Sequence, residues 1–254
     1  MTDLAKLTWP EAAELFTADT VALLPIGSTE PHGPHLPLDT DATIALVQAR
    51  RAAKRLWEAG VRCIVLPVLG YGLTRFTEGF AGAVTLRPGT LWALIEDVVE
   101  SLETQGIERV VLSNGHLEPA HVEVLRGVVL DHAERSKGHA QVLFPDNTRR
   151  RWAETLGEEF QSGDCHAGRY ETSIVLYADR DAVRRTEAAG LPRLEVDLVE
   201  KMRAGVTSFR EAGAALAYCG DPASASAEEG RELIEQLAEM IVTTIREAWP
   251  ELFG

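Results

Sequence analysis

The chain has 254 residues, of which 45% are hydrophobic and 25% are charged, so it is long enough to bury a full core. These fractions are typical of globular proteins, and they exclude intrinsic disorder, a collagen-like repeat and a membrane bundle. Against 39 Asp and Glu there are only 25 Lys and Arg, which gives a net charge of −14. So acidic a surface repels nucleic acid and anionic membranes, and we expect neither as a partner.

The sequence carries no sign of secretion. Cys63, Cys165 and Cys219 are far apart and form no paired motif, so neither a disulfide framework nor a zinc ribbon is indicated. The first residues lack a basic start followed by an apolar segment, and no run of about 18 apolar residues occurs. We therefore expect a protein of the reducing cytoplasm.

The first 144 residues alternate between two apolar patterns. Nearly unbroken apolar runs are typical of strands buried on both faces, and apolar residues at helical spacing indicate amphipathic helices. In chain order the patterns predict a helix over 8–16, a strand over 21–26, a helix over 39–59, a strand over 61–69, a short strand over 83–86, a helix from 88 to the stop at Gly106, a strand over 109–113, a helix over 119–133 and a strand over 140–144. This alternation predicts an α/β fold, layered α/β/α with a mostly parallel central sheet.

The remaining residues are less regular. Helical spacing predicts helices over 149–156 and 166–178, and a glycine-richer stretch follows over 179–222. Residues 221–254 contain a strongly amphipathic helix whose acidic face we expect in solvent. No repeat, low-complexity tract or linker interrupts the chain, so we predict one domain over residues 1–254.

The loop after the first long strand has an unusual composition. Residues 27–41 contain two histidines, three carboxylates, two glycines and three prolines. Histidine with carboxylate is the ligand set for zinc or manganese, and in such a fold functional residues gather beyond the carboxyl ends of the strands. We predict that Glu30, His32 and Asp41 bind metal and that His35 fixes the loop or supports a ligand.

A second loop leaves the strand predicted over 109–113 and enters a helix at Pro119. His116 and Glu118 stand two residues apart in it, as Glu30 and His32 do in the first loop. In an extended segment, side chains at this spacing share a face. His116 and Glu118 are therefore also predicted to be metal ligands.

A third cluster spans residues 164–173. His166 and Glu171 lie five apart on the predicted helix, which suits a general acid or base and the residue that supports it. Cys165 is not favoured as a nucleophile that His166 would activate, because adjacent side chains on a helix point apart. The other histidines lie on or after a helix without a carboxylate pattern and are predicted to be structural; they are His121, His132 and His139.

Four motifs carry a family resemblance. They are LPIGSTE at 24–30, HGPHLP at 32–37, NGH at 114–116 and ETS at 171–173 after His166. With them the sequence resembles the creatininase (creatinine amidohydrolase) family. The resemblance implies a layered α/β fold, two zinc or manganese ions per chain, hydrolysis of a C–N bond and often a hexamer. It further implies that Glu30, Asp41 and His116 hold one ion, and that His32, Asp41 and Glu118 hold the other with Asp41 bridging.

The chain departs from the pattern of true creatininases near the expected substrate. Phe76 and Thr77 stand where many members have Glu and His, Leu117 replaces a tyrosine, and Ser162 replaces a tryptophan. Because the aromatic side chains that would grip creatinine are missing, we expect a different substrate. Thr74 and Leu117 are predicted to contact it.

The sequence thus favours a metal-dependent amidohydrolase. Its substrate would be a small cyclic amide, a formamide or a peptide-like metabolite, attacked by a metal-activated hydroxide while His166 protonates the leaving nitrogen. Two alternatives stay open. One is hydrolytic C–C cleavage of a cyclic polyol ketone at the same metal site, and the other is a non-catalytic metal-binding protein. Beyond this small-molecule substrate, the expected partner is a further copy of the chain in a homo-oligomer.

Overall fold

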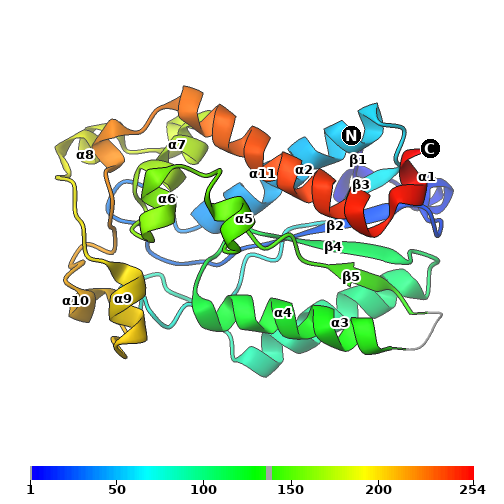
Figure 1. Ribbon diagram of the computed structural model, residues 1–254, viewed down its shortest axis with the longest axis horizontal. Coiled ribbons are helices and arrows are strands. Elements are labelled where there is room, and N and C mark those ends of the chain that lie inside the picture. The colour runs from blue at the N-terminus through cyan, green and yellow to red at the C-terminus, as the bar shows by residue number, and fades with distance from the viewer. Residues whose placement is uncertain (1, 136–138) are drawn as a thin grey trace.

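The structure, a computed structural model, describes residues 2–135 and 139–254. Within these residues, five parallel strands pair in the order β1-β3-β2-β4-β5. They are β1 (Thr2–Asp3), β2 (Val21–Ile26), β3 (Cys63–Val65), β4 (Arg109–Asn114) and β5 (Gln141–Leu143). Helices cover both faces of the sheet (Figure 1), which confirms the predicted layered α/β fold.

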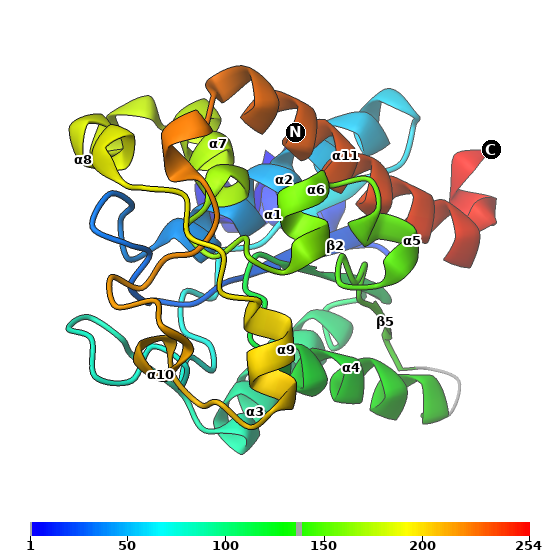
Figure 2. The same cartoon turned by 60° about the vertical axis from the view of Figure 1, so that its left-hand side comes forward.

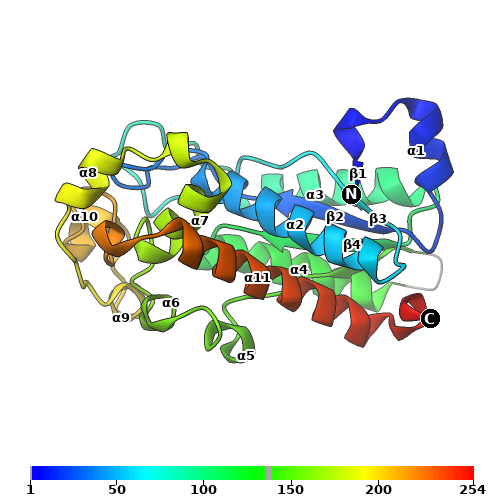
Figure 3. The ribbon, with the colours of Figure 1, turned by 90° about the horizontal axis from the view of Figure 1, so that it is seen from above.

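The two faces of β2 serve two separate cores. Val21 and Leu23 pack with one group of helices, whereas Ala22 and Leu24 pack with another, because successive side chains of a strand point to opposite faces. The first group, seen from above in Figure 3, is α2 (Thr40–Glu58), α7 (Arg169–Ala178) and α11 (Ala227–Ala248). The second is α3 (Pro88–Glu103) and α4 (Pro119–Glu134). A strand buried on both sides explains the unbroken apolar run over 21–26.

Several predicted elements are shorter in the structure. The strand predicted over 61–69 is regular only in β3, and the chain then touches β2 through a single bridge at Leu69. Residues 83–86 form no strand; Val84 makes one antiparallel bridge to Thr29. The helix predicted over 149–156 is reduced to α5 (Arg150–Ala153). The two strand segments carry apolar residues but pair with a neighbour only in isolated bridges, which periodicity does not reveal.

The irregular stretch predicted over 179–222 contains short helices. They are α8 (Arg185–Gly190), α9 (Leu198–Arg203) and α10 (Phe209–Ala212), and they join α6 (Glu158–Ser162) at the end of the sheet toward which β2 and β4 run (Figure 2). The other helical segments are α1 (Trp9–Leu15), η1 (Leu4–Lys6), η2 (Arg180–Ala182), η3 (Pro222–Ser224) and η4 (Pro250–Phe253). No helix among the described residues has both the length and the apolarity needed to cross a membrane.

Candidate metal centre

Two glycines bring the start of α2 against the ends of the central strands. A Cβ atom on Gly115, just after β4, would overlap the backbone carbonyl of Asp41, and a Cβ on Gly27, just after β2, would overlap the backbone of Ala42. Only glycine permits so close an approach. The packing therefore delivers Asp41, in the first turn of α2, to the point where the loops after β2 and β4 meet.

The first group of candidate ligands is Glu30, Asp41 and His116. His116 Nδ1 lies 3.0 Å from Asp41 Oδ2 and 3.3 Å from Glu30 Oε1, and all three side chains are buried. His116 Nε2 donates to the carbonyl of Leu73 at 2.6 Å, so in the neutral ring Nδ1 carries a lone pair directed at two carboxylate oxygens. Asp41 Oδ2 makes no hydrogen bond to any residue that the structure describes. Such a donor set fits a divalent cation.

The second group repeats this arrangement around His32. Its Nδ1 donates to the backbone carbonyl of Glu30 at 3.1 Å, which leaves Nε2 facing Asp41 Oδ1 at 3.1 Å and Glu171 Oε2 at 3.4 Å. Ligand atoms of His32, Asp41 and Glu171 lie within 4.8 Å of one another, as do those of the first group. The two oxygens of Asp41 therefore face different imidazoles, which is the geometry that a bridging ligand needs.

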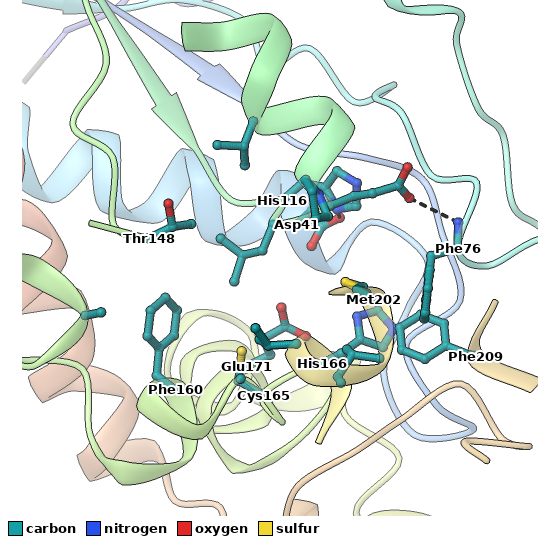
Figure 4. A pocket seen from close by; sticks show the side chains of 18 of the residues that line it. Asp41, Phe76, His116, Thr148, Phe160, Cys165, His166, Glu171, Met202 and Phe209 are labelled. Carbon is teal, nitrogen blue, oxygen red and sulfur yellow. Dashed lines mark hydrogen bonds and ion pairs between the residues drawn. The ribbon is translucent and has the colours of Figure 1, made fainter. Parts of the chain in front are cut away.

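Glu118 does not join either group of described residues. It lines the same pocket, but its Oε2 accepts a hydrogen bond from the backbone N–H of Phe76 at 3.1 Å (Figure 4). Burial raises the pKa of Glu118. The place beside His32 that the family pattern implies for Glu118 is occupied here by Glu171, which approaches from α7.

His166 lies in a turn before α7 and not on the predicted helix. Its Nε2 donates to the carbonyl of Pro31 at 3.0 Å, so Nδ1 faces the centre, 3.8 Å from Glu30 Oε1. The ring stacks on Phe209 with centroids 4.3 Å apart, and it lies 4.4 Å from the ring of His32. His32, His116 and His166 therefore share one arrangement. In each ring one nitrogen is hydrogen-bonded to a backbone carbonyl, and the other nitrogen faces buried carboxylates.

Glu171 supports His166 through the backbone. Its Oε2 accepts a hydrogen bond at 2.6 Å from the backbone N–H of Ala167. The φ angle of Ala167 is 51°, in the left-handed region that residues other than glycine rarely adopt. A left-handed residue cannot continue a helix, which is why α7 begins only at Arg169. Burial raises the pKa of Glu171 to about 8.

The charged groups of the centre shift one another strongly. Burial would lower the pKa of His32, but Asp41 and Glu171 outweigh it and raise that pKa to about 10. Burial is likewise outweighed at His116, where carboxylates raise the pKa well above its ordinary value. In return, the imidazoles hold the pKa of Asp41 below its usual range. Burial and the neighbouring His32 lower the pKa of His166 to about 4.

Thr74 has a different place from the one predicted. It is buried outside the pocket lining, and its hydroxyl donates to Glu30 Oε2. Thr74 therefore orients a candidate ligand from behind the pocket lining. His35 bonds Thr172 Oγ1 at 2.9 Å through Nε2, and so fixes the loop after β2, as predicted.

The remaining histidines lie behind or away from the centre. His121 bonds Asn114 at 3.0 Å and packs edge-on against His116. The other two have carboxylate partners that the sequence pattern did not reveal: His132 bonds Glu96 and His139 bonds Glu103. None of the three belongs to a group of candidate metal ligands among the described residues.

A pocket of about 550 Å³ opens onto the candidate ligands. Leu117 lines it as predicted, and so do three aromatic side chains, Phe76, Phe160 and Phe209 (Figure 4). Phe160 and Phe209 had no sequence signal, because they come from short helices that only the tertiary fold brings to the site. Ser162 does not contribute to the pocket lining among the described residues.

Comparisons with known proteins show a family and a fold that this chain shares. A family model described as "Creatininase: Creatinine amidohydrolase" matches residues 5–245. The "Mycofactocin precursor peptide peptidase" of Mycolicibacterium smegmatis is 31% identical over 246 residues, 95% of this chain and 90% of that protein. The "Creatinine amidohydrolase" of Pseudomonas putida is 27% identical over 277 residues and covers 97% of each chain. The structure named "Creatininase Mn" superposes with a TM-score of 0.74 at 25% identity, over 98% of this chain and 99% of the other. A mutant creatininase of the "Zn-Zn type" gives 0.70 at 26% identity, over 98% of each.

Proposed function

The chain belongs to the creatininase family, and from this premise we propose that it is a metal-dependent amidohydrolase that cleaves a C–N bond in a peptide-like substrate. One observation carries the proposal. His32, His116 and His166 each donate one ring N–H to a backbone carbonyl and direct the other nitrogen at buried carboxylates. Imidazole oriented in this way is the usual arrangement around a protein-bound metal.

We assign Glu30, Asp41 and His116 to one ion, and His32 with Asp41 to a second. In this structure Glu171 is the third residue of the second group. The family pattern implies Glu118 as that ligand instead. Divalent ions held there would lower the pKa of water to near neutrality and polarise the carbonyl of the amide. Two related creatininase structures are named for manganese and for zinc, which suit the same imidazole and carboxylate donors.

His166 is the proposed proton carrier. Its ring is neutral near pH 7, because burial lowers its pKa. Nδ1 faces the centre and can take a proton from the attacking water and pass it to the leaving nitrogen. The Pro31 carbonyl and the Phe209 ring hold the imidazole in this orientation.

The size of the pocket favours a substrate larger than creatinine. About 550 Å³ with a largely apolar wall suits a molecule of drug-like size, and a small flat ring would leave most of it filled with water. One group of relatives is named for a peptide and another for creatinine. We therefore expect kcat/KM for creatinine below about 10⁴ M⁻¹s⁻¹, the low end for a natural substrate.

Metal analysis together with a substrate panel tests the proposal. The purified protein is loaded with manganese or zinc and assayed on creatinine, formamides and short N-acyl peptides, with detection of newly formed amine. Release of amine that depends on the ion supports amidohydrolysis. Ion-dependent turnover of a cyclic polyol ketone without new amine would support C–C cleavage instead. Two ions per chain without any turnover would favour the non-catalytic alternative.

A pair of variants separates the two candidates for the last ligand. Glu118→Gln and Glu171→Gln each remove one negative charge and keep the side-chain shape. If Glu171 binds the second ion, only Glu171→Gln should lower the stoichiometry from two ions toward one. Loss of an ion in Glu118→Gln alone would instead support the family pattern and require Glu118 to leave Phe76.

A further inference from the structure

Two arginines line a pocket whose other charged groups are mostly carboxylates. Arg126 reaches it from the middle of α4, and Arg203 from the last turn of α9. The chain as a whole carries a net charge of −14, so positive charge in a pocket is not a consequence of composition. An isolated guanidinium beside an active site commonly recognises an anionic group of a ligand.

Arg126 is held in a fixed orientation from one side. Its Nε and Nη2 donate to Asp146 Oδ2 at 2.9 and 2.7 Å, and Nη2 also donates to Thr148 Oγ1 at 2.9 Å. Nη1 makes no hydrogen bond to any residue within 2–135 and 139–254. The guanidinium is thus preorganised with a pair of N–H groups still available, which lowers the entropy lost when a ligand binds.

The local charge is positive even though Asp146 is nearby. Arg149 also binds Asp146, at 3.1 Å from Nε to Oδ2, so two arginines share one carboxylate and leave one positive charge. Arg203 forms no ion pair with another residue in the described part of the chain and adds a second. Arg150 binds Glu154 instead and does not line the pocket, which makes it the matched control.

Arg126 is placed in the pocket through its hydrogen-bond partner Thr148. Thr148 lies with Phe160 on the opposite side of the pocket from Phe76 and Phe209 (Figure 4). Apolar side chains make up much of the pocket lining and include Leu117, Val122 and Met202. A ligand that reaches from the metal centre to Arg126 therefore passes a largely apolar wall.

We propose that Arg126, assisted by Arg203, binds the carboxylate of a substrate whose scissile amide lies at the metal centre and whose intervening part is apolar. This inference rests on the proposed amidohydrolase function and names its substrate class. In a peptide-like amide the natural carboxylate lies on the side of the leaving amine, one or two residues beyond the cleaved bond. Arg126 is thus a specificity-determining residue, because a planar guanidinium matches a carboxylate with paired hydrogen bonds.

Binding of a probe that cannot be hydrolysed tests the assignment without turnover. The probe is the ketomethylene analogue of benzoylglycyl-L-phenylalanine, with CH₂ in place of the scissile N–H, prepared as the free acid and as the carboxamide. The Kd of each probe is measured by calorimetry on metal-loaded protein. We expect the acid to bind about tenfold or more tightly than the carboxamide, which is the usual scale for a charge-assisted hydrogen bond. Arg126→Gln should reduce this preference to under about threefold, whereas Arg150→Gln should keep it.

Arg203→Gln is a second test variant. Because the Arg203 side chain is exposed, its replacement should leave the folded structure intact. It should lower the preference for the acid about threefold. The inference is overturned if wild-type protein binds acid and carboxamide equally, if neither binds, or if Arg126→Gln and Arg150→Gln lower the preference alike. Hydrolysis of the parent peptide is measured separately. If it is not cleaved while the acid analogue keeps its preference, the proposed function fails and the binding role of Arg126 stands.

Discussion

The pocket has two walls that are built in different ways. The inner wall consists of Glu30, Asp41 and His116, which follow the ends of β2 and β4 directly or open α2. The outer wall consists of Phe160, Met202 and Phe209, which belong to α6, α9 and α10, helices of four to six residues. The reacting groups therefore rest on a buried sheet, and the apolar contacts rest on short irregular segments.

The walls also differ in how they are held. His116 of the inner wall, and His32 behind it, are each anchored on a backbone carbonyl. Much of the outer wall depends on one carboxylate, Asp164, which accepts hydrogen bonds from the backbone N–H groups of residues 196, 197 and 198 at the start of α9. Changes in the inner wall should abolish chemistry, and changes in the outer wall should alter substrate binding.

The largest effect is expected from Asp41→Ala. Asp41 offers one oxygen to each group of ligands, so its removal should lower metal content from two ions per chain toward none. Activity should then fall by about 10³-fold or more, since metal stabilisation of charge is worth several kcal/mol. The matched control is Asp39→Ala, an exposed carboxylate two residues earlier. Metal content above one ion per chain in Asp41→Ala would contradict the shared role.

His166→Ala tests whether the inner wall separates metal binding from proton transfer. We expect both ions to remain, while kcat falls by about 10²–10⁴, the usual size of a general acid–base contribution. Metal analysis and steady-state kinetics provide the two readouts, with His139→Ala as an exposed control. Because His166 Nδ1 also lies near Glu30 and His32, loss of an ion would instead make His166 a ligand.

Asp164→Asn should affect the outer wall alone. The amide NH₂ of asparagine would face a backbone N–H group that now donates to Asp164, and two donors cannot form a hydrogen bond. The start of α9 should therefore lose its fixed position over the pocket. We expect KM to rise about tenfold, with kcat within threefold and metal content unchanged, because one charge-assisted hydrogen bond contributes about 1.5–3 kcal/mol. Glu195→Gln, an exposed neighbour, is the control. A fall in kcat at unchanged KM would show that α9 contributes to the chemistry.

The smallest effect on activity is expected at His35, which fixes the loop after β2. Burial, together with the charge of His32, lowers the pKa of His35 from 6.5 to about 4. The folded state therefore favours the neutral ring, and this contribution to stability is present above pH 6.5 and is lost as the pH falls toward 4. The loss should reach about 2 kcal/mol between pH 7 and pH 5. Urea unfolding of ion-free protein should show a flatter pH dependence for His35→Gln, and identical slopes would exclude this role.

Much of the inner wall could be predicted from the sequence. The apolar runs ending at Ile26 and near Ser113 are local signals of buried strands, and the polar loops after them combine histidine with carboxylate within a few residues. Parallel strands end at the same edge of a sheet, so the two loops were expected to meet. The structure brings Glu30, His32, Asp41 and His116 together there.

The outer wall and the last ligand were decided only by the tertiary structure. Phe209 stacks on His166 from 43 residues further along the chain, and Arg126 faces the pocket because of the way α4 packs under the sheet. Whether Glu118 or Glu171 stands beside His32 depends on a left-handed turn at Ala167 and on a hydrogen bond to Phe76. Periodicity records which face of an element is buried, whereas contacts between distant short segments arise from packing that no local pattern encodes.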